Sequence, residues 1–153
     1  MPVVASVFVA SPFPARAFSD ADLTGGFGCI GKTHSTLGDF AELMQLNFNG
    51  AGHVTGSVHV LALGQDCLAS VGPSSGYSTN KSGTGSLTLN LAFSGSRCTS
   101  SSTKLGTQKL VFVLERAAMV FDFAAQDDFF SALWGRRDPG GSFTGSCTGQ
   151  GQF

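Results

Sequence analysis

Apolar and polar residues alternate strictly along residues 86–93, and this two-residue period constrains the fold more than any other feature. Every odd position from Leu87 to Phe93 is apolar, whereas Ser86, Thr88 and Asn90 are polar. Side chains of a β-strand point alternately to opposite sides of the sheet. The period therefore predicts a strand with one buried face.

Similar segments, separated by glycine-rich turns, follow one another along most of the chain. Asn49-Gly50 is the strongest of these turn signals, because Asn-Gly favours tight hairpins. We expect strands at residues 23–33, 40–48, 53–63, 67–71, 77–79, 86–93, 104–116, 119–123 and 142–148. Closing such a meander removes exposed sheet edges, so we predict an all-β fold: a single antiparallel up-and-down β-barrel of about eight strands.

Two segments depart from simple alternation. Residues 125–141 lack the period, and Asp127-Asp128 is suited to cap a short helix through Phe129–Trp134, so we expect one short helical insert there. This insert is either a lid over the barrel mouth or a cap packed on the barrel's end. Val111 and Val113 make both sides of their strand apolar, which predicts that both faces are covered.

The four cysteines allow two interpretations. Residues 24–29 and 142–147 have similar compositions, and antiparallel pairing of these two segments would seal the barrel and bring Cys29 to Cys147. Cys67 and Cys98 would then tie two loops in a second disulfide. The alternative is four buried thiols in a cytosolic barrel, since cysteine is often buried.

Residues 1–17 are predicted to be either a secretory signal or an N-terminal arm, and residues 18–153 to be the barrel domain. Val3–Ala10 is apolar and Ala15-Arg16-Ala17 fits a small-x-small cleavage site, but no basic residue precedes the apolar run. Together with the even cysteine count, this favours a secreted or periplasmic protein.

Charge and motifs exclude several classes of function. The net charge is −1 and only 12% of residues are charged, so a nucleic-acid partner is not expected. No apolar run approaches the ~18 residues of a membrane span. His53 and His59 lie about 20 Å apart along one strand, too far to share a metal. The chain has no CxxC and no phosphate-binding loop, and we predict no metal, no cofactor and no catalytic residue.

The chain resembles small exported bacterial β-barrels of the calycin type, a group that includes lipocalins, avidins and allene-oxide-cyclase-like barrels. The resemblance lies in the phrases LTGGFGC, LNFNGAGHVTGSV and YSTNKSGTGSLTL, and covers residues 23–148. A lipocalin's Gly-x-Trp is replaced by Gly25-Gly26-Phe27, and an avidin's several tryptophans are reduced to Trp134. The resemblance implies a barrel that often holds a small ligand, although many such proteins have no assigned function.

Glu42 is the most informative carboxylate, because it lies on the apolar face of its strand between Phe40 and Met44. A carboxylate inside a barrel is costly unless paired, and is often functional. Arg116 and Lys32 are candidate partners. The alternative is that Glu42 sits at the barrel rim and contacts water. The predicted ligand-binding residues are Glu42, Met44, Phe112, Arg116, Phe121 and Trp134.

Three functions are compatible with these features. The first is an exported, non-catalytic module that binds a small apolar ligand inside the barrel. The second is a structural or interaction barrel with no internal ligand, acting as a monomer or small homo-oligomer. The third is an enzyme of the cyclase or isomerase kind that uses Glu42.

Overall fold

The structure, a computed structural model, describes residues 16–35, 38–62, 65–94, 105–115, 119–125 and 142–151. One 3-10 turn, η1 (Asp20–Asp22), precedes nine strands. The strands are β1 (Thr24–Ser35), β2 (Gly38–Asn49), β3 (Val54–Ala62), β4 (Gln65–Val71), β5 (Gly76–Thr79), β6 (Thr84–Phe93), β7 (Leu105–Leu114), β8 (Val120–Ala125) and β9 (Ser142–Gly149). The predicted short helix through Phe129–Trp134 lies outside the described residues.

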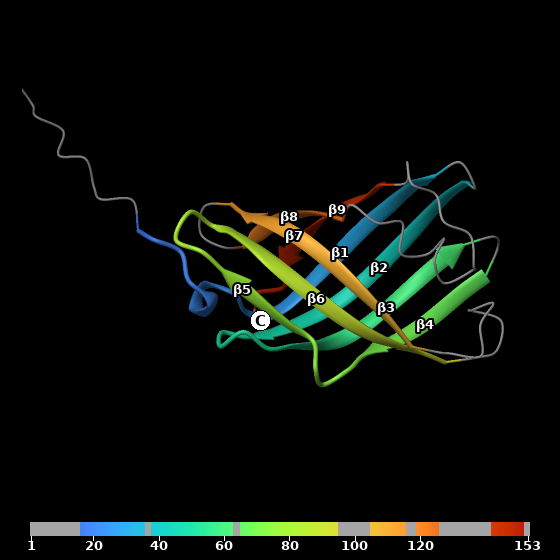
Figure 1. Ribbon diagram of the computed structural model, residues 1–153, viewed down its shortest axis with the longest axis horizontal. Coiled ribbons are helices and arrows are strands. Elements are labelled where there is room, and N and C mark those ends of the chain that lie inside the picture. Colours follow the sequence, from blue (N-terminus) through green and yellow to red (C-terminus); the bar gives the residue numbers. More distant parts are fainter. Residues whose placement is uncertain are drawn as a thin grey trace, which may run out of the picture.

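The strands form a closed antiparallel barrel, which confirms the predicted fold class. Neighbours follow the order β4-β3-β2-β1-β9-β8-β7-β6-β5, and a further pairing of β4 with β6 closes the ring of eight strands, to which β5 is added. The predicted contact between the first and last long strands is present as the β1–β9 ladder. Figure 1 shows the strands running obliquely along the long axis of the molecule, with η1 at one end.

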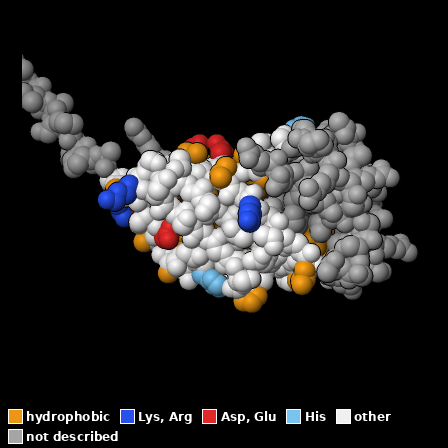
Figure 2. All heavy atoms as spheres, viewed as in Figure 1, with side chains coloured by type: hydrophobic (Ala, Val, Ile, Leu, Met, Phe, Trp, Pro, Cys, Tyr) orange, Lys and Arg blue, Asp and Glu red, His pale blue; other side chains and the backbone are white. Residues whose placement is uncertain are grey.

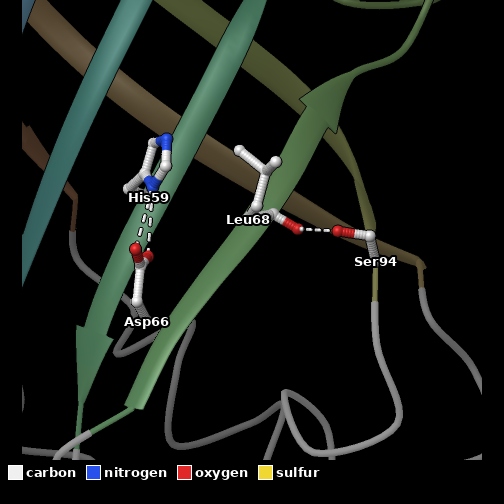
Figure 3. Close-up of polar contacts among 4 residues, drawn as sticks. All are labelled: His59, Asp66, Leu68 and Ser94. Atoms are coloured by element: carbon white, nitrogen blue, oxygen red, sulfur yellow. Dashed lines mark hydrogen bonds and ion pairs between the residues drawn. The ribbon is translucent and has the colours of Figure 1, made fainter.

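The closing seam between β4 and β6 is short, and side chains extend it. Three residue pairs form the ladder, from Ala69 opposite Phe93 to Val71 opposite Leu91. Beyond the ladder, the hydroxyl of Ser94 donates to the carbonyl of Leu68 at 3.1 Å (Figure 3). The backbone N–H of Ser94 donates to the same carbonyl at 3.0 Å. The seam is thus held by irregular hydrogen bonds as well as by sheet pairing.

The disulfide between Cys29 and Cys147 joins β1 to β9 across directly opposed positions. Their Cα atoms lie 4.0 Å apart, and both residues are almost fully buried. The prediction of this pairing is confirmed. Cys67 is also disulfide-bonded, whereas its predicted partner Cys98 lies outside the described residues.

Aromatic side chains fill the half of the barrel next to η1, which we call the η1 half. Phe27, Phe48, Tyr77 and Phe121 pack edge-on or tilted, with ring centroids 5.0–5.8 Å apart. The Tyr77 hydroxyl donates to the carbonyl of Leu23 at 2.9 Å, and burial raises its pKa. Aromatic contacts and this hydrogen bond hold the N-terminal turn against the barrel.

The opposite half, which we call the distal half, contains the ends of β1, β3, β6 and β8 and the starts of the strands that follow them. There the ring of Phe143 lies directly over Gly31, where an added Cβ would approach the ring to 2.3 Å. Glycine at this position therefore lets an aromatic ring from β9 pack flat on β1. Phe123 lies beside Phe143, with ring centroids 5.4 Å apart.

The outer face of the barrel corrects one expectation. Val111 and Val113 are 63% and 54% exposed, so the second face of β7 is not covered as predicted. Alternation fails to reveal this because valine favours strands on either face of a sheet. Figure 2 shows one face of the molecule, on which charged side chains are scattered among neutral ones.

Candidate functional site

Glu42 lies inside the barrel and is 0% exposed. It sits on β2, where it is paired with Gly31 of β1 on one side and Val60 of β3 on the other. The alternative that Glu42 contacts water at the rim is wrong, because the strand continues beyond it toward the distal end and Phe40 is also buried. Lys32 is exposed on the outer face of β1, so its predicted pairing with Glu42 is also wrong.

Gln108 of β7 meets Glu42 across the lumen. Its side-chain Nε2 donates a hydrogen bond to Oε2 of Glu42 at 3.2 Å, and Gln108 is only 1% exposed. Three strands separate β2 from β7 in either direction around the ring, so the two strands are diametrically opposed. The Glu42–Gln108 pair is therefore a polar contact that spans the mainly apolar lumen of the barrel.

Within the part of the chain that the structure describes, three buried polar atoms of the distal half have no hydrogen-bond partner. They are Oε1 of Glu42, Oε1 of Gln108 and the hydroxyl oxygen of Thr33. Thr33 faces the interior from β1, two positions beyond the Gly31 that pairs with Glu42. Because most buried polar groups in folded proteins are paired, a cluster of unpaired atoms indicates a site where further hydrogen bonds can form.

Burial raises the pKa of Glu42 from 4.5 to about 8, and the hydrogen bond from Gln108 opposes this only in part. The reason is that the charged carboxylate would lose its hydration among the neighbouring Val60, Met44 and Phe143 side chains. At neutral pH the carboxyl group is therefore mainly protonated and uncharged.

Neither a protein family nor an individual relative identifies this site. No family model, curated protein or solved structure matches the chain. The chemistry of the site therefore has to be argued from its own geometry.

The structure brings together only part of the predicted ligand-binding set. Met44 faces the interior next to Glu42 on β2, whereas Phe112 and Phe121 belong to the aromatic packing of the η1 half, with ring centroids 5.5 Å apart. Arg116 and Trp134 lie outside the described residues. The site is thus centred on Glu42, and its hydrogen-bond partner, Gln108, was not among the predicted residues.

Gln108 and Thr33 were not among the predicted site residues, although the sequence carries a signal for both. Gln108 lies an even number of positions from Leu110 and Phe112 and so shares their face of the strand. Thr33 shares a face with Cys29 for the same reason. Polar residues at buried-face positions of an alternating strand are the pattern that singled out Glu42. Applied to every strand, it finds all three.

Two other features lie on the outer face. A groove of about 600 Å³ crosses β5 to β8 and includes Val111, Val113 and Asp122. Elsewhere, Ile30, Leu43 and Leu68 fall in one cross-strand row with His59, whose ring is paired with Asp66 at 3.0 Å (Figure 3).

In the part of the chain that the structure describes, no three His, Cys, Asp or Glu side chains gather as a metal site would require. No helix within that part has the length and apolar character to traverse a bilayer.

Proposed function

We propose that this protein is an exported, non-catalytic barrel that binds a small, predominantly apolar ligand in its distal half. The observation that carries the proposal is the group of unpaired polar atoms on Glu42, Gln108 and Thr33. Leaving a buried polar atom unpaired costs about 1–3 kcal/mol. A ligand with a polar group at one end would satisfy these atoms.

The surroundings of the three polar residues suit an apolar ligand body. Phe40, Phe93 and Phe143 are buried interior residues of the distal half, each near the end or start of its strand. Eight-stranded barrels are wide enough inside to hold one small ligand. An apolar wall with a few convergent polar groups is the usual composition of a small-molecule site.

Export and a relationship to calycin-type barrels belong to the same proposal. The Cys29–Cys147 disulfide supports export, because such bonds persist mainly in oxidising compartments. The closed up-and-down order of the strands supports the calycin relationship. Residues 1–15, which include most of the predicted signal, lie outside the described residues.

A binding role is favoured over catalysis because, among the described residues, no other ionisable side chain pairs with Glu42. Its hydrogen-bond partner Gln108 does not titrate, nor does Thr33. Tyr77, the other interior residue able to titrate among those described, belongs to the η1 half. Acid–base catalysis usually needs groups with complementary protonation states.

Titration of the full chain with 1-octanol, followed by heteronuclear NMR, tests the proposed function. Saturable shifts and intermolecular NOEs are expected at Phe40, Phe93 and Phe143. Glu42→Leu should weaken binding about tenfold, because one hydrogen-bonding group is lost. The control Gln45→Leu, on the outer face of the same strand, should bind as the wild type does. Absence of saturable binding, or NOEs confined to the outer face, would contradict the proposal.

An interaction barrel is the second candidate, and the exposed row of Ile30, Leu43 and Leu68 favours it. These side chains are 57%, 44% and 43% exposed, on β1, β2 and β4, and His59 of β3 lies between Leu43 and Leu68. Light scattering after size exclusion distinguishes the two functions. A concentration-dependent dimer that Leu43→Lys abolishes, without 1-octanol binding in the interior, would favour the interaction role.

A further inference from the structure

We infer that the Glu42–Gln108 pair recognises a neutral head group that both donates and accepts a hydrogen bond, such as a primary alcohol or a primary amide. This inference rests on the proposed function, because it assigns the chemistry of the ligand's polar end. Two observations support it. The existing hydrogen bond leaves one oxygen atom of each side chain unpaired, and the described side chains around the pair carry no charge.

The existing hydrogen bond determines what each unpaired atom can do. Oε2 of Glu42 accepts from Nε2 of Gln108, so the proton of the uncharged carboxyl group resides on Oε1. Oε1 of Glu42 is therefore a donor without an acceptor, and Oε1 of Gln108 is an acceptor without a donor. A group that offers one acceptor and one donor completes both.

No charged side chain among the described residues faces this pair. Thr33 of β1, Val60 of β3 and Leu89 of β6, next to Gln108, are interior neighbours on adjoining strands, and none of them titrates. The lysines next in sequence, Lys32 and Lys109, are exposed on the outer face.

The cysteines of the interior, Cys29, Cys67 and Cys147, are disulfide-bonded and do not titrate. A ligand carboxylate would thus be buried without a counter-charge from the described residues. An ammonium group would have to lose its hydration, and Glu42 would have to lose its proton to provide a counter-charge. Both steps cost free energy, so a neutral head group is favoured over either ion.

Isothermal titration of the full chain at pH 6 with five ligands of equal chain length tests the inference. The ligands are 1-octanol, octanamide, 2-octanone, octanoate and octylammonium. We expect 1-octanol and octanamide to bind about fivefold more tightly than 2-octanone, which only accepts a hydrogen bond. Octanoate and octylammonium should bind at least about tenfold more weakly than 1-octanol, because each brings a charge into the interior.

Two variants test whether the Glu42–Gln108 pair causes the preference for 1-octanol over 2-octanone. Gln108→Leu removes the acceptor, so the preference for 1-octanol over 2-octanone should disappear. Glu42→Gln keeps a neutral donor at the same place and should retain the preference. Lys109→Gln, on the outer face beside Gln108, is the matched control and should leave all five affinities unchanged.

The pH dependence of 2-octanone binding gives a second measurement on these proteins. Ionisation of Glu42 removes the donor that the ketone needs, so its affinity should fall between pH 6 and pH 9 in the wild type. Glu42→Gln, which has no carboxyl group to ionise, should show no such fall.

The outcomes separate this inference from the proposed function. If none of the five ligands binds, both are wrong. If all five bind within about twofold of one another, or an ion binds most tightly, the ligand-binding function stands and the neutral head group is wrong. If Gln108→Leu fails to fold, the ranking of the five ligands on the wild type still decides.

Discussion

Glu42 keeps a carboxyl group where its charged form is poorly solvated, and the fold tolerates it by keeping the group protonated. The hydrogen bond from Gln108 satisfies one oxygen and leaves the other without a partner. A site of this kind is expected to weaken the fold when the proton is lost, since an isolated buried charge is costly.

The stability of the protein should therefore depend on pH through Glu42. Its pKa is about 8 in the folded state and near 4.5 when exposed. Between these values the folded state holds a proton that the unfolded state has lost. The free energy of unfolding should then fall as pH rises through this window, by about 1.4 kcal/mol per pH unit.

Urea denaturation of the wild type and of Glu42→Gln at pH 5 and pH 8 measures this contribution. The variant has no carboxyl group at this position. Its free energy of unfolding, relative to that of the wild type, should therefore be higher at pH 8 than at pH 5. A difference that is the same at both pH values would show that Glu42 is not protonated in the folded state.

At the scale of secondary structure, the shortest ladder is the seam between β4 and β6, beyond which β5 replaces β4 along the edge of β6. Between β4 and β5, the chain turns through residues 72–75, and the ladder is replaced by individual hydrogen bonds. The N–H of Gly72 donates to the carbonyl of Asn90 at 2.7 Å, and the N–H of Asn90 donates to the hydroxyl of Ser75 at 2.9 Å. The turn thus preserves the closure of the barrel.

Ser75→Ala should destabilise the protein by about 1–3 kcal/mol, because the partly buried N–H of Asn90 would lose the acceptor that the buried Ser75 provides. Ser74→Ala is the matched control, since Ser74 is exposed and its hydroxyl accepts only from the Asn90 side chain. Chemical denaturation of both variants provides the comparison. Equal losses of stability would mean that the Ser75 hydroxyl does not support the seam.

At the scale of the whole molecule, the β1–β9 ladder pairs the first and last long strands of the chain. The Cys29–Cys147 disulfide lies within that pairing and joins residues 118 positions apart. A cross-link over so long a loop restricts the unfolded chain strongly. The same bond therefore stabilises the closed ring without adding new contacts to the folded state.

Replacing both cysteines by alanine should lower the free energy of unfolding by about 4 kcal/mol, mainly through the greater entropy of the unfolded chain. Thermal or urea denaturation of the double variant measures the loss, with Ser146→Ala, an exposed neighbour on β9, as the control. A loss below about 1 kcal/mol would indicate that strand pairing alone closes the barrel.

The local pattern of the sequence determined the strands, their buried faces and most of the turns. Alternation predicted that Leu87 and Phe93 point inward, and Asn49-Gly50 marked a hairpin whose Asn side chain accepts from two backbone N–H groups. The similarity of the first and last strands even predicted the disulfide. Strand period and turn chemistry depend on neighbouring residues, so they can be read without knowing the fold.

Only the tertiary structure decided which interior side chains meet. Glu42 and Gln108 are 66 positions apart, and their contact depends on two strands lying opposite one another in the closed ring. The exposure of Val111 likewise depends on what covers the outside of the barrel. Alternation assigns a side chain to a face, whereas closure and register decide its partners across the lumen, because these depend on all eight strands at once.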